Sequence, residues 1–218
     1  MKFSVAVFVF LFVFSCQKNE KPKLDPPTMV QDSPVIVKDK IVKLSDQEIL
    51  KIQEQEEKER SQIVRKYTVS KKGNGFEYIV FCEEQKSGMI NFPKVEILKS
   101  GKLFQKLTDI DSTLVLHDYE VSFSCDEDWN FDGYKDFTLI KWVGMVDQSY
   151  HLWLFDEKSG KYIFSPSFSK IINPVLDKKS REITSSYHAG PTTYYYSTYQ
   201  FKKGKFVRTH FEVEGEED

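Results

Sequence analysis

Apolar and polar residues follow one pattern before Tyr67 and another after it. The segment 45–66 opens with Ser45-Asp46-Gln47-Glu48 and then spaces a few isoleucines among many charged residues. A serine followed three residues later by a glutamate is the capping box that opens many helices. The pattern predicts a helix over 45–66 that is largely exposed and has only a narrow apolar stripe.

From Tyr67 to residue 213, short runs of β-branched and aromatic residues alternate with Gly, Asn, Asp, Ser and Lys. Such runs are typical of strands, and such interruptions are typical of turns. Glycine-containing turns at 99–101, 157–160 and 202–205 each join two runs as a hairpin. The segment 67–213 is therefore predicted to be one mainly β, antiparallel domain. Its strands are expected at 75–83, 94–99, 102–107, 113–124, 136–143, 149–156, 161–164, 181–187, 193–202 and 205–213.

The first 44 residues lack the pattern of a folded domain. Residues 1–16 carry one lysine and then an apolar run, which is too short to cross a bilayer as a mature helix. This predicts a signal peptide. Its end, Val13-Phe14-Ser15-Cys16, resembles a bacterial lipobox, so Cys16 is the expected lipidation site; ordinary secretion with cleavage nearby is the alternative. Residues 17–44 mix proline with charge and predict a disordered tether, and residues 214–218 predict an acidic tail.

Length and charge narrow the class of protein. A chain of 218 residues with ordinary apolar content is expected to bury one core. The net charge of -2 and the isoelectric point near 6.1 argue against a nucleic-acid partner, because no surplus of lysine and arginine is available to neutralise phosphates. With Cys16 lipidated, the protein would lie in the cell envelope, anchored to a bacterial membrane and facing the periplasm or the surface.

The chain has three cysteines. If Cys16 carries lipid, Cys82 and Cys125 remain as an even pair in an oxidising compartment, where disulfides persist. A Cys82–Cys125 disulfide is therefore predicted. Two buried free thiols are the alternative.

The stretch Asp126 to Asp136 carries an oxygen-bearing side chain at every second position and then a glycine. Ca²⁺ takes six to eight oxygen ligands, and glycine permits the sharp turn that wraps a loop around it. The twelfth position of a full EF-hand loop would be a glutamate, and here it is Leu139, so Asp136 would have to close the site. An acidic, solvated turn without metal is the alternative. The predicted ligands of a structural Ca²⁺ are Asp128, Asn130, Asp132, Tyr134 through its carbonyl, and Asp136.

Catalysis by the chain itself has little support. The four histidines are scattered, and none has the spacing of a metal-binding motif. No G-x-S-x-G nucleophile motif occurs either. A carboxylate pair for glycoside hydrolysis stays an alternative, but the acids at 126–136 are already assigned to the metal. We therefore predict no catalytic residue and expect that the protein is not an enzyme.

The order of several features in the C-terminal half is more distinctive than any one of them. DEDWNFDGYKDF is followed by YHLWLFDEKSGKYI, then by INPVLDKKSREITSSYHAG, and finally by YYYSTYQF with a GKF hairpin. This series resembles the periplasmic lipoproteins that act as immunity proteins, which inhibit lysozyme-like effectors delivered between bacteria by type IV secretion systems. The resemblance implies a propeller-like or sandwich-like β domain with a calcium loop.

The resemblance also implies a protein partner, a lysozyme-like peptidoglycan hydrolase. The candidate inhibitory element would be the loop that contains Ser185, Ser186, Tyr187, His188 and Gly190. A glycoside hydrolase has a long cleft with two catalytic carboxyl groups, and hydroxyl and imidazole groups on a protruding loop can fill such a cleft. A plain interstrand loop is the alternative. Exposed tyrosines at 194–196 and 199 keep a calcium-stabilised carbohydrate-binding module open, and a scaffolding lipoprotein is a further possibility.

Overall fold

The computed structural model describes residues 45–111 and 121–215. The predicted signal peptide, Cys16 and the tether to residue 44 lie outside the described residues, as do most of the predicted strand 113–124 and residues 216–218 of the tail. The described segments belong to one compact unit, 44–218. Within them, no helix is both long and apolar enough to cross a membrane.

The helix α1 spans Asp46–Arg60 and is capped as the sequence predicts. The Glu48 carboxylate accepts a hydrogen bond from the Ser45 backbone N–H at 2.8 Å, and the Ser45 hydroxyl accepts one from the Glu48 N–H at 3.4 Å. None of its residues is buried. The prediction that the helix continues to residue 66 was wrong, because the β-branched pair Ile63-Val64 already opens a strand.

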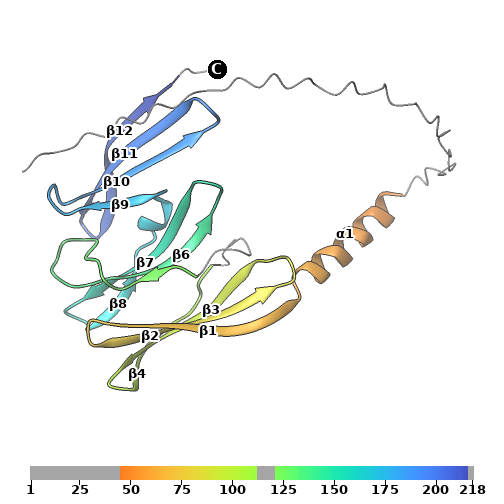
Figure 1. Ribbon diagram of the computed structural model, residues 1–218, viewed down its shortest axis with the longest axis horizontal. Coiled ribbons are helices and arrows are strands. Elements are labelled where there is room, and N and C mark those ends of the chain that lie inside the picture. Colours follow the sequence, from red (N-terminus) through yellow and green to blue (C-terminus); the bar gives the residue numbers. More distant parts are fainter. Residues whose placement is uncertain (1–44, 112–120, 216–218) are drawn as a thin grey trace, which may run out of the picture. The chain divides into compact units, whose positions relative to one another are not determined.

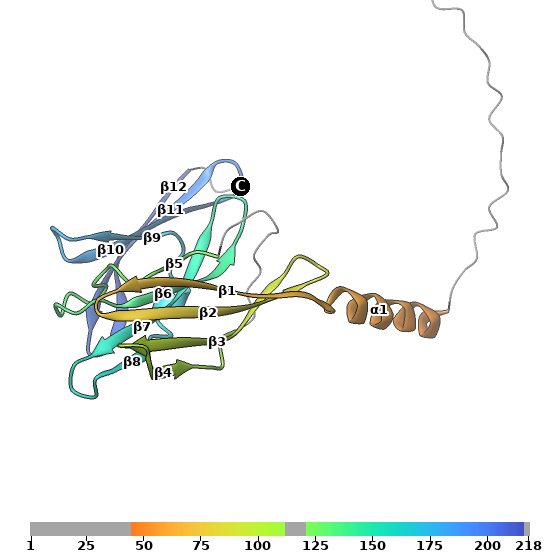
Figure 2. The same cartoon turned by 60° about the horizontal axis from the view of Figure 1, so that its bottom comes forward.

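The strands form three four-stranded antiparallel sheets, so the predicted mainly β fold with an N-terminal helix is confirmed (Figures 1 and 2). The first sheet has the order β1-β2-β3-β4, with β1 at Ile63–Gly73, β2 at Phe76–Gln85, β3 at Ile90–Lys99 and β4 at Lys102–Leu107. The second has the order β5-β6-β7-β8, with β5 at Phe123–Ser124, β6 at Phe137–Val143, β7 at Gln148–Asp156 and β8 at Lys161–Phe164. The third has the order β12-β11-β10-β9, with β9 at Pro174–Asp177, β10 at Glu182–Ala189, β11 at Thr193–Lys202 and β12 at Lys205–Glu214.

The second sheet contributes to two hydrophobic clusters, because successive side chains of a strand point to opposite faces. Trp153 on β7 belongs to the cluster shared with the first sheet, where the Tyr78 ring stacks on Phe137 with centroids 5.2 Å apart. Its neighbour Leu152 belongs to the other cluster, with residues of the third sheet and of the 3-10 helix η1, Phe168–Lys170. The first four residues of β6, which pairs with β7, are likewise buried, so the segment that precedes β6 leads directly into the core.

Candidate functional site

The acidic stretch forms a closed loop between β5 and β6. At its neck the Asp136 N–H donates to the Glu127 carbonyl at 2.8 Å. Inside the loop, the Asp128 carboxylate accepts from the N–H groups of Asp132 at 3.1 Å and Gly133 at 2.8 Å. Gly133 has a φ of 98°, a conformation that glycine adopts without steric cost. The alternate polar side chains are thus turned toward the loop backbone.

Asp136 differs from the other loop acids because its side chain is buried, with 1% exposure. Its carboxylate accepts from the Trp129 N–H at 2.7 Å and from the Phe155 N–H of β7 at 3.0 Å. Burial raises the pKa of Asp136 to about 7, the two N–H donors oppose that rise, and the charges of Asp132 and Asp128 add to it. Asp136 therefore joins the loop to β7, one of the two inner strands of the second sheet.

Residues of the β9–β10 turn contact the same loop from the third sheet. The Arg181 guanidinium donates to the Phe131 carbonyl at 2.6 Å, and Lys178 forms an ion pair with Glu127 at 2.7 Å. Phe131 has a φ of 61°, in the left-handed region that residues other than glycine rarely adopt. These long-range contacts hold the outer side of the loop, and its sequence alone gives no sign of them.

The residue types of the loop fit Ca²⁺, whereas their positions fit it less well. Carboxylate, amide and carbonyl oxygens are the ligands that Ca²⁺ takes. Among the described residues, however, no three His, Cys, Asp or Glu side chains come close enough together to hold a metal ion. The Asp136 carboxylate faces backbone N–H groups of Trp129 and Phe155, although each carboxylate oxygen keeps a further lone pair. Calcium binding by Asp128, Asn130, Asp132, Tyr134 and Asp136 stays a prediction.

The predicted disulfide is wrong, because Cys82 and Cys125 are both buried free thiols. The Cys125 sulfur lies against Gly73, only 2.6 Å from where a Cβ would stand. Gly73 pairs with Phe76, and Cys82 is six residues farther along β2, or about 20 Å at roughly 3.3 Å per residue. A disulfide needs Cα atoms within about 7 Å of each other. The even number of remaining cysteines carries no information on this distance.

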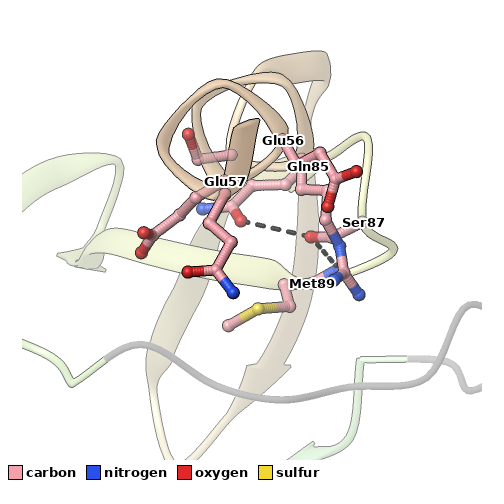
Figure 3. Close-up of a pocket in the computed structure, with 8 residues that line it drawn as sticks. Glu56, Glu57, Gln85, Ser87 and Met89 are labelled. Carbon is pink, nitrogen blue, oxygen red and sulfur yellow. Dashed lines mark hydrogen bonds between the residues drawn. The ribbon is translucent and has the colours of Figure 1, made fainter. Parts of the chain in front are cut away.

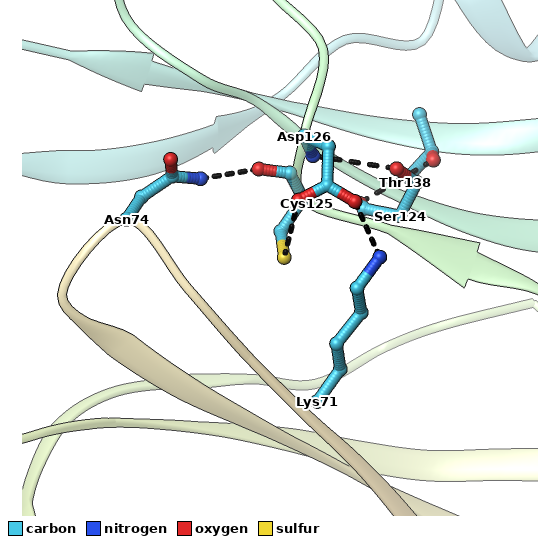
Figure 4. Close-up of polar contacts among 6 residues, drawn as sticks. All are labelled: Lys71, Asn74, Ser124, Cys125, Asp126 and Thr138. Atoms are coloured by element: carbon cyan, nitrogen blue, oxygen red, sulfur yellow. Dashed lines mark hydrogen bonds and ion pairs between the residues drawn. The ribbon is translucent and has the colours of Figure 1, made fainter.

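Cys125 instead forms part of the junction between the first and second sheets (Figure 4). The Asn74 side chain, in the β1–β2 turn, donates to the Cys125 carbonyl, and Lys71 forms an ion pair with Asp126. Burial raises the pKa of the Cys125 thiol, so this sulfur is a packed, unreactive group. The neck of the acidic loop is thereby fixed to the β1–β2 hairpin.

The predicted inhibitory loop is mostly strand, which corrects its expected shape. Ser185, Ser186, Tyr187 and His188 all lie within β10, and the turn begins at Gly190, where φ is 74°. Ser185 is buried, with 4% exposure, and its hydroxyl donates to the Ile172 carbonyl. Ser185 is therefore inaccessible to a partner, and the accessible element is the end of the β10–β11 hairpin.

Aromatic rings form a row across this hairpin and into β12. The Tyr187 and Tyr195 rings stack with centroids 5.0 Å apart, and Tyr195 stacks on Phe211 with centroids 6.1 Å apart. On the other face of the same strands, His188 contacts Tyr194 at 5.7 Å between centroids. The sequence shows that alternate tyrosines share a face, but it does not fix the register that brings Tyr187 beside Tyr195.

A hollow that the sequence did not predict lies where α1 meets the β2–β3 turn (Figure 3). It has a volume of about 550 Å³, and its lining includes Glu56, Glu57, Arg60 and Met89. The helix residues are all exposed, and Ser87 donates to Gln85 at 3.3 Å within the turn. These side chains are solvated and carry no arrangement of a nucleophile with a base.

The described histidines are not gathered at one site. His151 is buried among aromatic rings, and burial together with the charge of Lys141 lowers its pKa to about 4. His188 and His210 are exposed on the third sheet. His117 lies outside the described residues. The expectation that the chain is not an enzyme stays a prediction.

No protein-family model matches the chain, and no curated protein sequence matches it. One similar solved structure is that of a Xanthomonas type IV secretion system related protein, with 21% identity and a TM-score of 0.49. The match covers 72% of this chain and 86% of that chain. A likeness of this degree assigns neither a function nor a partner to the chain.

Proposed function

We propose that the chain is a lipid-anchored protein of the cell envelope that binds and inhibits a lysozyme-like peptidoglycan hydrolase through the end of the β10–β11 hairpin. The observation that supports this most is the placement of Tyr187 and His188. They are neighbours at the end of β10, where Tyr187 is half-buried and His188 is exposed, and each ring contacts an aromatic ring of β11. The hairpin end thus presents a hydroxyl on one face and an imidazole on the other, because successive side chains of a strand point to opposite faces.

The hairpin end is suited to enter a narrow cleft. Its backbone is paired from Ile183↔Tyr199 to Ala189↔Thr193, so little conformational entropy is lost when a partner binds. The His188 Nδ1 lies 2.9 Å from the Gly190 carbonyl, which fixes the ring and leaves Nε2 for a partner. Opposite a hydrolase with two catalytic carboxyl groups, the Tyr187 hydroxyl can donate to one carboxylate while the hairpin excludes the glycan.

We further infer that Ca²⁺ binds the loop of Asp128, Asn130, Asp132, Tyr134 and Asp136 and has a structural role. Several carboxylates share this loop, and within the described part of the chain no lysine or arginine forms an ion pair with Asp128, Asp132 or Asp136. A divalent cation would balance these charges. It would act on the loop between β5 and β6, with no role in substrate chemistry.

The test is a titration of hydrolase activity. Hydrolases captured by the protein from lysates of the source bacterium and of competing bacteria would be purified and assayed on peptidoglycan. We expect inhibition to reach completion at one inhibitor per enzyme. Tyr187→Ala should weaken inhibition at least tenfold, whereas Thr184→Ala, exposed on the same strand but away from its end, should not. Full inhibition by the Tyr187→Ala variant would exclude this hairpin as the inhibitory element.

A carbohydrate-binding function is the second candidate, favoured by the opposite face of β11. Tyr194 and Tyr196 are 44% and 37% exposed there, and the Tyr196 hydroxyl donates to Glu214 at 3.1 Å. Exposed tyrosine rings next to a carboxylate are groups that can stack on sugars and bind their hydroxyls. If purified glycan strands bind the protein when no hydrolase is present, and if Tyr194→Ala abolishes this binding, the result would support this function over inhibition.

A further inference from the structure

The edge strands of the three sheets differ in how well they are protected from pairing with another chain. Four of the edges are short, because β4, β5, β8 and β9 have 6, 2, 4 and 4 residues. The other two, β1 with 11 residues and β12 with 10, are long enough to add a strand. Exposed long edges are the sites at which sheets recruit further strands, unless charge or shape prevents it.

Charge makes self-association through β1 unfavourable. Its sequence IVRKYTVSKKG contains four basic residues and no acidic one. A second β1 would therefore bring like charges together in either direction. Arg65 and Lys66 form ion pairs with Glu84 and Glu83, but these glutamates lie on β2, so β1 itself offers a partner strand no acidic side chain. This edge has the protection that natural sheets commonly use.

Charge on β12 has the opposite arrangement. Lys205, Arg208 and His210 precede Phe211, and Glu212 and Glu214 follow it. A second copy running parallel would place like charges side by side. A second copy running antiparallel would place the basic half of one strand against the acidic half of the other. The strand is thus complementary to itself in one direction only.

Exposed apolar side chains of β12 lie near the centre of this charge pattern. Phe211 is 44% exposed and Val213 is 42% exposed, and both are on the face that carries the row Tyr187, Tyr195 and Phe211. Arg208 lies over the Phe211 ring at 4.4 Å and covers part of it. Within the described residues the aromatic row ends at Phe211 because β12 is the edge of its sheet.

We propose that a second copy of the chain pairs with β12 in an antiparallel, two-fold symmetric manner centred on Phe211. Phe211 then faces its own counterpart, and His210 faces Glu212 of the second copy. The aromatic row continues from one copy into the other, and both hairpin ends stay accessible. This inference stands on the edge strand alone and does not depend on the proposed inhibition.

The strand also limits how far the pairing extends. A bulge opposite Thr198 and Tyr199 shifts the register of β12 between Arg208 and His210. Bulges bend a strand and increase its twist, so regular pairing is expected only around Phe211. A short interface of this kind gives a concentration-dependent dimer rather than a permanent one.

Sedimentation of the purified full chain in mild detergent tests the charge pattern. His210→Glu or Glu212→Lys alone should raise the dimer dissociation constant at least about tenfold, because each contact of a two-fold interface occurs twice. The double variant His210→Glu/Glu212→Lys should restore the dimer, since an acidic and a basic side chain then face each other across the two-fold axis. Leu103→Lys, on the exposed edge strand β4, is the control and should leave association unchanged. A monomer at all concentrations, or no effect of the single variants, would overturn the proposal.

A cysteine cross-link tests the register. In a Cys16→Ser background, the remaining natural thiols are the buried Cys82 and Cys125. Phe211→Cys should then form a disulfide with its own counterpart under mild oxidation, because facing residues of antiparallel strands have Cα atoms about 5 Å apart. Val213→Cys, placed off the two-fold axis, should not. Equal cross-linking of the two variants would rule out the symmetric register, and cross-linking of Val213→Cys alone would place the axis elsewhere.

Discussion

The acidic loop and the end of the β10–β11 hairpin are held in place by different forces. The loop is fixed by hydrogen bonds to a buried carboxylate, since Asp136 accepts from Trp129 and from Phe155 of the central sheet. The hairpin end is fixed by strand pairing and by ring stacking, and neither Tyr187 nor Tyr195 belongs to a core cluster. Substitutions in the loop should therefore change stability, and substitutions at the hairpin end should change binding.

The largest effect is expected at Asp136. Asp136→Ala removes the acceptor for two partly buried N–H groups, each of which costs about 1–3 kcal/mol when left unsatisfied. The free energy of unfolding should fall by about 3 kcal/mol, measured by urea denaturation in the presence of chelator.

Asp177 provides a matched control for that measurement. Its carboxylate also accepts from two N–H groups, those of Lys179 at 2.9 Å and Ser180 at 3.2 Å, but in a solvated turn. Asp177→Ala should lower the free energy of unfolding much less, because water replaces the lost acceptor. Equal losses in the two variants would mean that burial of Asp136 is not what fixes the loop.

Much of the fold, but not all of it, could be predicted from the sequence. The alternation of polar and apolar residues predicted most strands, and glycines predicted the turns between them. Ser45 with Glu48 predicted the start of the helix. The strand at Ile63–Gly73 was missed because its charged residues continue the pattern of the helix before it. Local patterns predict local structure well, and here they failed where a partner strand decides the outcome.

Contacts between distant segments were the part that the sequence could not supply. The spacing of the acidic loop predicted side chains turned inward, yet it did not predict that Asp136 accepts from Phe155. Counting cysteines suggested a bridge, whereas the register of β1 with β2 keeps Cys82 far from Cys125. The tyrosine row likewise depends on the pairing of Tyr187 with Tyr195. Strand register and tertiary packing determine these contacts, and residue spacing predicts neither.

The second effect in size concerns Ca²⁺. If the loop binds the ion in the folded state alone, an ion concentration 100 times the dissociation constant raises the free energy of unfolding by about 2.7 kcal/mol. Asp132→Ala should abolish this difference between calcium and chelator. Asp126→Ala is the control, because Asp126 pairs with Lys71 outside the predicted ligand set. If calcium does not change the thermal denaturation of the unaltered protein, the prediction of a calcium site is wrong.

The third effect is a pair of opposite pH dependences in chelator. Asp136 has a pKa of about 7, above the ordinary 3.8, so the folded state binds the extra proton and stability falls as pH rises from about 4 to 7. His151 has a pKa of about 4, below the ordinary 6.5, so stability falls as pH drops from about 6.5 to 4. Each slope is about 1.4 kcal/mol per pH unit, and they offset each other between pH 4 and 6.5.

Replacing His151 should reveal the pH dependence of stability that Asp136 contributes. Unaltered protein should unfold at nearly the same urea concentration at pH 5.5 and pH 6.5, whereas His151→Phe should be less stable at pH 6.5 by about 1.4 kcal/mol. Added calcium should reverse this trend, because the ion binds the ionised Asp136 and competes with its proton. A His151→Phe variant as insensitive to pH as the unaltered protein would show that Asp136 does not titrate in this range.

The smallest effect on stability, and the sharpest test of the contrast, is expected at Tyr195. This ring lies between Tyr187 and Phe211, so Tyr195→Leu keeps an apolar side chain but removes both stacking contacts. Stacked pairs contribute about 0.5–1.5 kcal/mol beyond burial, and less where the rings are partly solvated, so the melting temperature should change little. Inhibition should still weaken, though less than in Tyr187→Ala, because Tyr187 keeps its hydroxyl and loses only the ring that orients it. Phe201→Leu, which changes a partly buried ring packed against the core cluster that contains Leu152 and Phe168, should have the opposite profile, with lower stability and unchanged inhibition. If Tyr195→Leu and Phe201→Leu instead change stability and inhibition in the same proportion, the hairpin end acts through the fold and not as a separate binding element.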